Sequence, residues 1–253
     1  MRAWDGSVNE SPGRRSAPDV IFRFRYGLHV LTYATAFFLS WADPLHLGAR
    51  RVWLDLPLTM SNVLHLDLQT AIVTLTAAAT LLAFAAAWLR TWATAYLGSQ
   101  TVFDASLRGD RINAAGPYRY LRNPLYVGTV LHTLALSVLM TWSGAVFCIV
   151  VIVAMQVALV MAEERFWQAA GDPAYGRYAA RVPRVLPRFR AGIEGSSRVK
   201  ARWPQALAGE VYLWGVAISF AALGFTYNAV LVLQGVVVSF GLSIAVRGLL
   251  RER

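Results

Sequence analysis

Residues 116–128 read GPYRYLRNPLYVG, a run that places two arginines and a helix start directly before an apolar stretch. Asn123 is a favoured residue just before a helix, and Pro124 suits the first helical position, where its missing N–H removes no hydrogen bond. The run therefore predicts a helix that begins at Pro124, with Asn123 as its cap. The unpaired N–H groups and the positive dipole end of such a helix, next to Arg122, attract a carboxylate or phosphate. A juxtamembrane arginine cluster that only fixes topology is the alternative.

The composition predicts an all-α integral membrane protein. Of the 253 residues, 57% are hydrophobic, and the mean hydropathy is +0.46. Such a chain is too apolar for an ordinary soluble domain and has long uncharged runs. We expect six transmembrane helices, at about 26–41, 70–89, 125–142, 144–161, 206–225 and 228–246.

The basic residues predict the orientation of these helices. Of the 24 Lys and Arg, 22 lie in segments 1–25, 90–124, 162–205 and 247–253, and the other two lie in the loop at 42–67. By the positive-inside rule, both termini and the two long basic loops are cytoplasmic. Topology and anionic lipid headgroups then account for the net charge of +10, so nucleic acid is not an expected partner. The expected location is a bacterial-type inner (plasma) membrane.

The spans at 125–142 and 144–161 are separated only by a turn near Ser143–Gly144, which predicts an antiparallel helical hairpin over 125–161. Both ends of that hairpin return to the same side of the membrane, so Arg122 should lie near Glu163 and Glu164. Structural salt bridges between these groups are the alternative to a binding site.

A short helix is predicted at 173–181, since Gly171 can stop the preceding helix and Pro173 suits a first position. Its spacing gives an aromatic and basic face made of Tyr175, Arg177, Tyr178 and Arg181. This helix is interpreted as an amphipathic lid on the membrane surface, and a purely structural amphipathic helix is the alternative.

Few other polar residues stand out. Cys148 is the only cysteine, and the four histidines lack ligand spacing, so no metal site is expected. His132 and Gln156 are interpreted as interhelical hydrogen-bond partners. Glu210 is either a functional intramembrane acid or an interfacial residue.

These observations divide the chain into a disordered basic tail at 1–25, N-terminal transmembrane helices at 26–97, a core with the candidate site at 98–190, a linker at 191–205 and a C-terminal transmembrane hairpin at 206–253.

Two blocks together resemble the integral membrane methyltransferases that include isoprenylcysteine carboxyl methyltransferases and phospholipid methyltransferases. The matching residues are Gly116, Tyr118, Arg122, Asn123, Pro124, Tyr126 and Gly128, then Glu163, Glu164, Gly171, Tyr175, Tyr178, Val182, Arg184 and Pro187. The resemblance covers about residues 98–188. It implies an S-adenosylmethionine-dependent enzyme whose lipophilic acceptor arrives from the bilayer.

The resemblance assigns roles to residues of this sequence. Arg122 and Glu164 are the expected catalytic residues, and Glu164 is the candidate base if the acceptor is an amine. The cofactor is expected to contact Ile112, Asn113, Tyr118, Arg122, Asn123, Pro124, Tyr126, Glu163 and Glu164, and the substrate is expected to contact Tyr178 and Arg181. Cationic, anionic and aromatic groups suit the carboxylate, ammonium and sulfonium of this cofactor.

Two departures bear on the acceptor, which could be a prenyl-cysteine-like or other lipid carboxylate, or a lipid amine. Asn123 stands where prenylcysteine-specific members favour His, and residues 159–161 carry no arginine for a substrate carboxylate. The alternatives for the whole chain are an NADPH-dependent membrane sterol-type reductase and a non-enzymatic membrane scaffold.

Overall fold

The computed structural model describes residues 17–42, 44, 46–47, 50–97, 115–169, 171, 173–193 and 200–251. Within these ranges the protein is helical, as predicted, and the only extended pairing is an isolated bridge between Arg51 and Thr141. The helices are α1 (Ala17–Ala42), α2 (Val52–Leu64), α3 (Leu68–Leu97), the 3-10 helix η1 (Gly116–Arg119), α5 (Pro124–Ser137), α6 (Trp142–Ala169), α7 (Pro173–Arg181), α8 (Trp203–Gly209), α9 (Val211–Thr226) and α10 (Ala229–Arg251).

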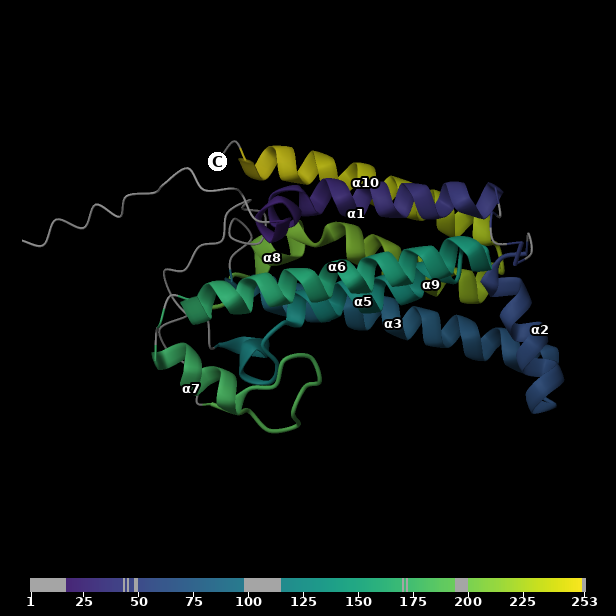
Figure 1. The fold of residues 1–253 in the computed structure, drawn as a ribbon. Coiled ribbons are helices and arrows are strands. Elements are labelled where there is room, and N and C mark those ends of the chain that lie inside the picture. Colours follow the sequence, from purple (N-terminus) through teal and green to yellow (C-terminus); the bar gives the residue numbers. More distant parts are fainter. Residues whose placement is uncertain are drawn as a thin grey trace, which may run out of the picture.

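The bundle consists mainly of helices that lie side by side, namely α1, α3, α5, α6, α9 and α10 (Figure 1). The main packed pairs are α3 with α5, α1 with α6, α9 with α10, and α3 with α9. Alanines on α3, among them Ala79, Ala83 and Ala87, are buried at these contacts, and Phe220 on α9 is fully buried. Small residues let helix backbones approach closely, as is common where helices pack within a membrane.

Two helices of the described chain, α3 and α6, are long and apolar enough to cross a membrane. The bent pair α8–α9, with 67° between its halves, could form a third span. The predicted count of six transmembrane helices is therefore not confirmed. At 14 residues, α5 rises only about 21 Å, less than the roughly 30 Å of a hydrocarbon core.

The predicted hairpin is present as α5 and α6, but its turn lies earlier than expected. Helix α5 ends at Ser137 and α6 already begins at Trp142, so Ser143 and Gly144 are helical. A Cβ on Gly144 would lie 2.3 Å from the carbonyl oxygen of Ala36. The glycine thus permits close packing of α6 on α1, and this contact, rather than a turn, explains its place in the sequence.

The segment expected as a loop at 42–67 contains helix α2, which the sequence analysis missed. Its first turn is fixed by backbone hydrogen bonds from Val52 N–H to Met140 O (2.8 Å) and from Trp53 N–H to Val138 O (2.9 Å). The Trp53 indole N–H donates to Thr76 Oγ1 at 3.1 Å. Trp53 is therefore a buried residue of the core and not the interfacial side chain that an outer loop would present.

The end of the bundle opposite α2 gathers the segments that matter for the site. There α3 ends, α5 begins, α6 ends, and α7 and α8 lie nearby (Figure 1, left). We call this the α7 end of the bundle. Both ends of the α5–α6 hairpin reach it, as the short connection between the two helices predicted.

A buried ion pair joins three helices near the α7 end. The Arg90 guanidinium donates to both Glu210 oxygens, at 3.0 and 3.1 Å, and to Thr129 Oγ1 on α5 at 2.9 Å. Thr94 Oγ1 also donates to Glu210, at 2.8 Å. Glu210 is only 2% exposed and lies at the break between α8 and α9. The predicted span ends at residue 89, whereas α3 continues to Leu97 because Arg90 has a carboxylate partner inside the bundle.

Replacing Glu210 by Gln should lower the free energy of unfolding by about 3–5 kcal/mol, because it leaves the Arg90 cation buried without a counter-charge. The double variant Arg90→Met, Glu210→Met removes both charges and should recover much of that loss. Chemical unfolding in mixed micelles measures both values. A double variant no more stable than Glu210→Gln would show that the pair is not electrostatically coupled.

Candidate functional site

The first sequence block forms a compact turn before α5. Gly116 has a φ of +55°, and a Cβ there would lie 2.4 Å from the Tyr96 ring, so the position requires glycine. Helix α5 then begins at Pro124, as predicted. The predicted side-chain cap is wrong, because Asn123 makes no capping hydrogen bond and its Nδ2 donates instead to Arg184 O at 3.0 Å. The hydrogen bond to the carbonyl of Arg184 therefore takes the place of the capping bond that local sequence preference predicts.

The predicted approach of Arg122 to the acidic pair is confirmed. Arg122 Nη1 lies 3.1 Å from Glu164 Oε1, across the mouth of the α5–α6 hairpin. Arg184 approaches the same carboxylate from the other side, with Nη2 2.6 Å from Oε2. Glu164 is 6% exposed. One buried carboxylate thus holds two guanidinium groups from different segments.

Arg184 belongs to the matched motif, but the sequence analysis did not include it among the site residues. The hydrogen bonds to Glu164 raise the pKa of the Arg184 guanidinium, so it keeps its charge. The residues next to Arg184 in the sequence do not indicate that Glu164 is its partner. The run of Val182, Arg184 and Pro187 in the second block was the only available signal.

Glu163 has a different environment from its neighbour. Its carboxylate accepts a short hydrogen bond from the Tyr126 hydroxyl, which comes from the first turn of α5. The two acids at the end of α6 therefore divide their partners: Glu163 binds a hydroxyl on α5, and Glu164 binds two arginines.

Two buried polar atoms near these acids have no hydrogen-bond partner among the described residues. They are Tyr118 Oη and Arg122 Nε. Burial, followed by the negative charge of Glu163, raises the pKa of Tyr118 well above its usual value, so the phenol keeps its proton and can donate it. An unpaired buried donor costs stability, so such atoms suggest a missing partner.

Helix α7 spans Pro173–Arg181, as predicted, but its aromatic and basic residues lie on different faces. Tyr175 and Tyr178 are buried, whereas Arg177 and Arg181 are exposed. The Tyr178 hydroxyl donates to Tyr118 O at 2.9 Å. Tyr178 therefore lies at the site, whereas Arg181, the other residue expected to contact the substrate, is exposed.

Trp167 lies between the end of α6 and this helix. Its ring stacks on that of Tyr175, with centroids 6.0 Å apart and 16° between the planes. The aromatic residues expected to cover a cofactor are thus grouped at the α7 end, and Trp167 already has an aromatic neighbour there.

Of the predicted site residues, the structure brings together Tyr118, Arg122, Asn123, Pro124, Tyr126, Glu163, Glu164 and Tyr178. Ile112 and Asn113 lie outside the described residues.

No group of three or more potential metal-binding side chains occurs in the described part of the chain. His132 Nε2 pairs with the Tyr212 hydroxyl at 3.3 Å and Gln156 Nε2 with His29 Nε2 at 2.9 Å, which confirms their expected structural role.

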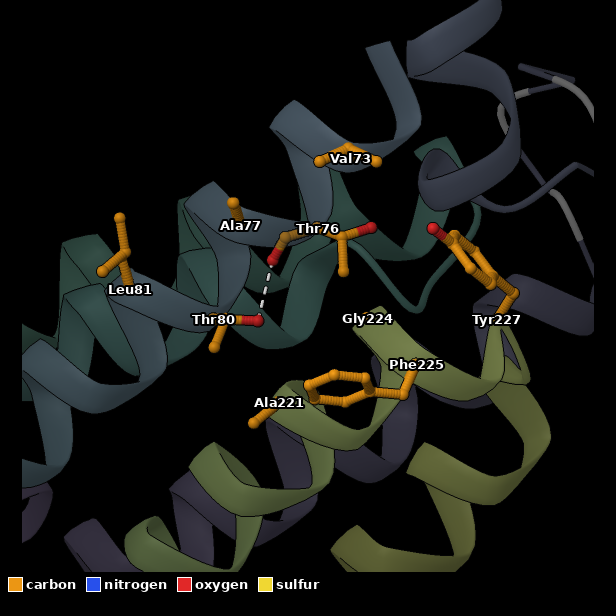
Figure 2. A pocket seen from close by; sticks show the side chains of 9 residues that line it. All are labelled: Val73, Thr76, Ala77, Thr80, Leu81, Ala221, Gly224, Phe225 and Tyr227. Carbon is orange, nitrogen blue, oxygen red and sulfur yellow. Dashed lines mark hydrogen bonds between the residues drawn. The ribbon is translucent and has the colours of Figure 1, made fainter. Parts of the chain in front are cut away.

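A separate apolar groove of about 390 Å³ lies between α3 and α9, toward the α2 end of the bundle (Figure 2). Two of its polar side chains are bonded, since Thr80 Oγ1 donates to Thr76 O at 2.8 Å and Thr76 Oγ1 accepts from the Trp53 indole N–H. The groove lacks charged groups and does not include the residues of the candidate site.

The comparisons with known proteins agree with the motif. Residues 74–170 match the family model for phospholipid methyltransferases. This match confirms the resemblance to membrane methyltransferases, and it covers α5, α6 and most of α3. Searches of curated proteins and of solved structures returned no match.

The unpaired Tyr118 hydroxyl allows a test of whether the site is built for a ligand. Tyr118→Phe should leave the free energy of unfolding unchanged or raise it by about 1–3 kcal/mol, because it removes an unsatisfied buried group. Tyr178→Phe is the matched control and should lose about 1 kcal/mol with its hydrogen bond to Tyr118 O. Unfolding measurements on both variants would contradict this account if Tyr118→Phe were the less stable one.

Proposed function

We propose that this chain, whose residues 74–170 match the phospholipid methyltransferase family, transfers a methyl group from S-adenosylmethionine to a lipophilic acceptor in the membrane. The observation that carries the proposal is the Arg122–Glu164 pair at the ends of α5 and α6. It joins the two blocks of the family-like motif at one end of an apolar helical hairpin.

The residues present fit the chemical groups of this cofactor. Arg122 Nε and the Tyr118 hydroxyl are buried donors without partners among the described residues, which suits an incoming carboxylate. Glu163, with a single hydroxyl donor from Tyr126, could accept from an ammonium or ribose hydroxyl. Bound there, the cofactor would supply an activated methyl group on a sulfonium, whose positive charge the Glu163 carboxylate would favour.

Arg122 and Glu164, the residues expected to carry the reaction, would act as a unit. Both Glu164 oxygens accept from arginines, so its main task in this arrangement is to hold Arg122 in place. Methyl transfer depends on placing the acceptor in line with the methyl group and on excluding water. Buried side chains around the pair, including Tyr178 and Leu121, serve that exclusion.

The acceptor would enter from the bilayer beside α5 and α6. We propose a lipid carboxylate or a lipid amine as the acceptor class, and an orientation in which both termini and the site face the cytoplasm. The 22 basic residues in the segments at that side support the orientation.

Cofactor binding should depend on Arg122. Arg122→Ala should weaken binding of S-adenosylmethionine about 10- to 100-fold, the value of one or two charge-assisted hydrogen bonds. Glu164 keeps Arg184 as a partner in this variant, so the fold should persist. Arg165→Ala is the matched control, because Arg165 is exposed at the same end of α6. Calorimetric titration of purified protein with S-adenosylmethionine and with NADPH measures both affinities, and binding of NADPH alone would overturn the proposal.

Transfer from methyl-labelled cofactor into a membrane lipid extract should label lipid, and Arg122→Ala should abolish the labelling. Treatment of the product with base then identifies the acceptor. Release of methanol indicates a carboxyl ester, and stable label in lipid indicates N-methylation. Absence of transfer by a protein that binds S-adenosylmethionine would contradict the enzymatic proposal.

A further inference from the structure

The segment that follows α7 exposes large apolar side chains. In residues 185–190, which we call the VLPRFR loop, Leu186 is 79% exposed and Phe189 is fully exposed. Val185 is also exposed. Scattered surface leucines are ordinary, but three apolar side chains in one short loop form a patch that suggests a binding surface.

This exposure does not result from a loose backbone. Arg122 N–H donates to Pro183 O at 2.8 Å, and Arg188 N–H donates to Tyr120 O at 3.2 Å. Beyond the loop, Gly192 N–H donates to Arg119 O at 2.9 Å. The loop is therefore held against the turn before α5 on both sides, while its apolar side chains stay exposed.

The charge around the loop is strongly positive. Residues 173–193 contain five arginines and no Asp or Glu. Arg184 is neutralised by Glu164, whereas Arg177, Arg181, Arg188 and Arg190 are exposed. Arg188 Nη1 donates to Arg181 O at 2.9 Å, and this acceptor is a neutral carbonyl that does not cancel the charge of Arg188. An occupant of this surface must be anionic and must also accept apolar side chains.

The position of the loop identifies such an occupant. It lies beside the bundle at the α7 end, close to where the candidate membrane span α6 ends (Figure 1). At that level a bilayer presents phosphate headgroups above the upper part of its acyl chains. We propose that the VLPRFR loop docks onto the anionic surface of the surrounding bilayer, with Leu186 and Phe189 between lipid chains and Arg188 and Arg190 on lipid phosphates.

The test uses the whole protein in lipid nanodiscs with an environment-sensitive fluorophore on Phe189→Cys. Cys148 is fully buried in the core and should stay unlabelled. In nanodiscs containing anionic lipid, a lipid spin-labelled near its headgroup should quench the probe, and iodide in the water should not. Removing both charges with Arg188→Gln and Arg190→Gln should lower the ratio of lipid-quenched to iodide-quenched probe roughly fivefold for each arginine.

Arg165→Gln serves as the matched control, because it removes one charge from the same end of the bundle but outside the loop. It should leave the ratio unchanged. Quenching by iodide alone would overturn the proposal. A probe shielded from both quenchers would also overturn it, in favour of contact with a second copy or another protein. Quenching by lipid and quenching by iodide do not require methyl transfer, so this test is independent of the proposed function.

Discussion

The buried Arg90–Glu210 ion pair is the interaction on which the rest of this structure depends. Glu210 is almost fully buried and Arg90 is largely so, which makes each charge rely on the other, and the hydrogen bonds of the pair reach α3, α5 and the break between α8 and α9. Arg90 Nη1 also lies 3.3 Å from Leu125 O, one residue after the first position of α5. Arg122 lies two residues before the first position of α5, and Tyr126 lies two residues after it. Glu210, from the C-terminal half of the chain, thus holds the arginine that contacts the helix end at which the candidate site lies.

The candidate site also depends on a buried carboxylate that is paired with arginine. Glu164 is bound by Arg122 and Arg184, which come from opposite sides of α6 and α7 in the sequence. Backbone hydrogen bonds between residues 119–122 and 183–192 support the same arrangement. The two motif blocks therefore form one structural unit, in which the second block fixes the position of the first. Tyr118 Oη and Arg122 Nε remain as the buried donors that this unit does not use among the described residues.

Features with local causes could be predicted from the sequence. The helix start at Pro124, the short helix Pro173–Arg181 and the hairpin that brings Arg122 to Glu164 all follow from nearby residues and from the length of the apolar runs. Features decided by distant partners could not. Asn123 binds Arg184 O instead of capping its helix, Gly144 packs on Ala36, and Arg90 stays helical because Glu210 lies opposite. Helix α2 was missed because Asp55 and Pro57 made its sequence resemble a loop.

The position of Glu210 in the sequence also limits how far the chain can be shortened without loss of the bundle's ion pair. The family match ends at residue 170, forty residues before the acid that neutralises Arg90. A protein trimmed to the matched region would therefore keep a buried cation and lose its counter-ion. The matched region and the packed helical bundle therefore have different boundaries, and the last two helices belong to the bundle. The residue that suits position 90 consequently depends on the residue at position 210, although the two lie 120 residues apart in the sequence.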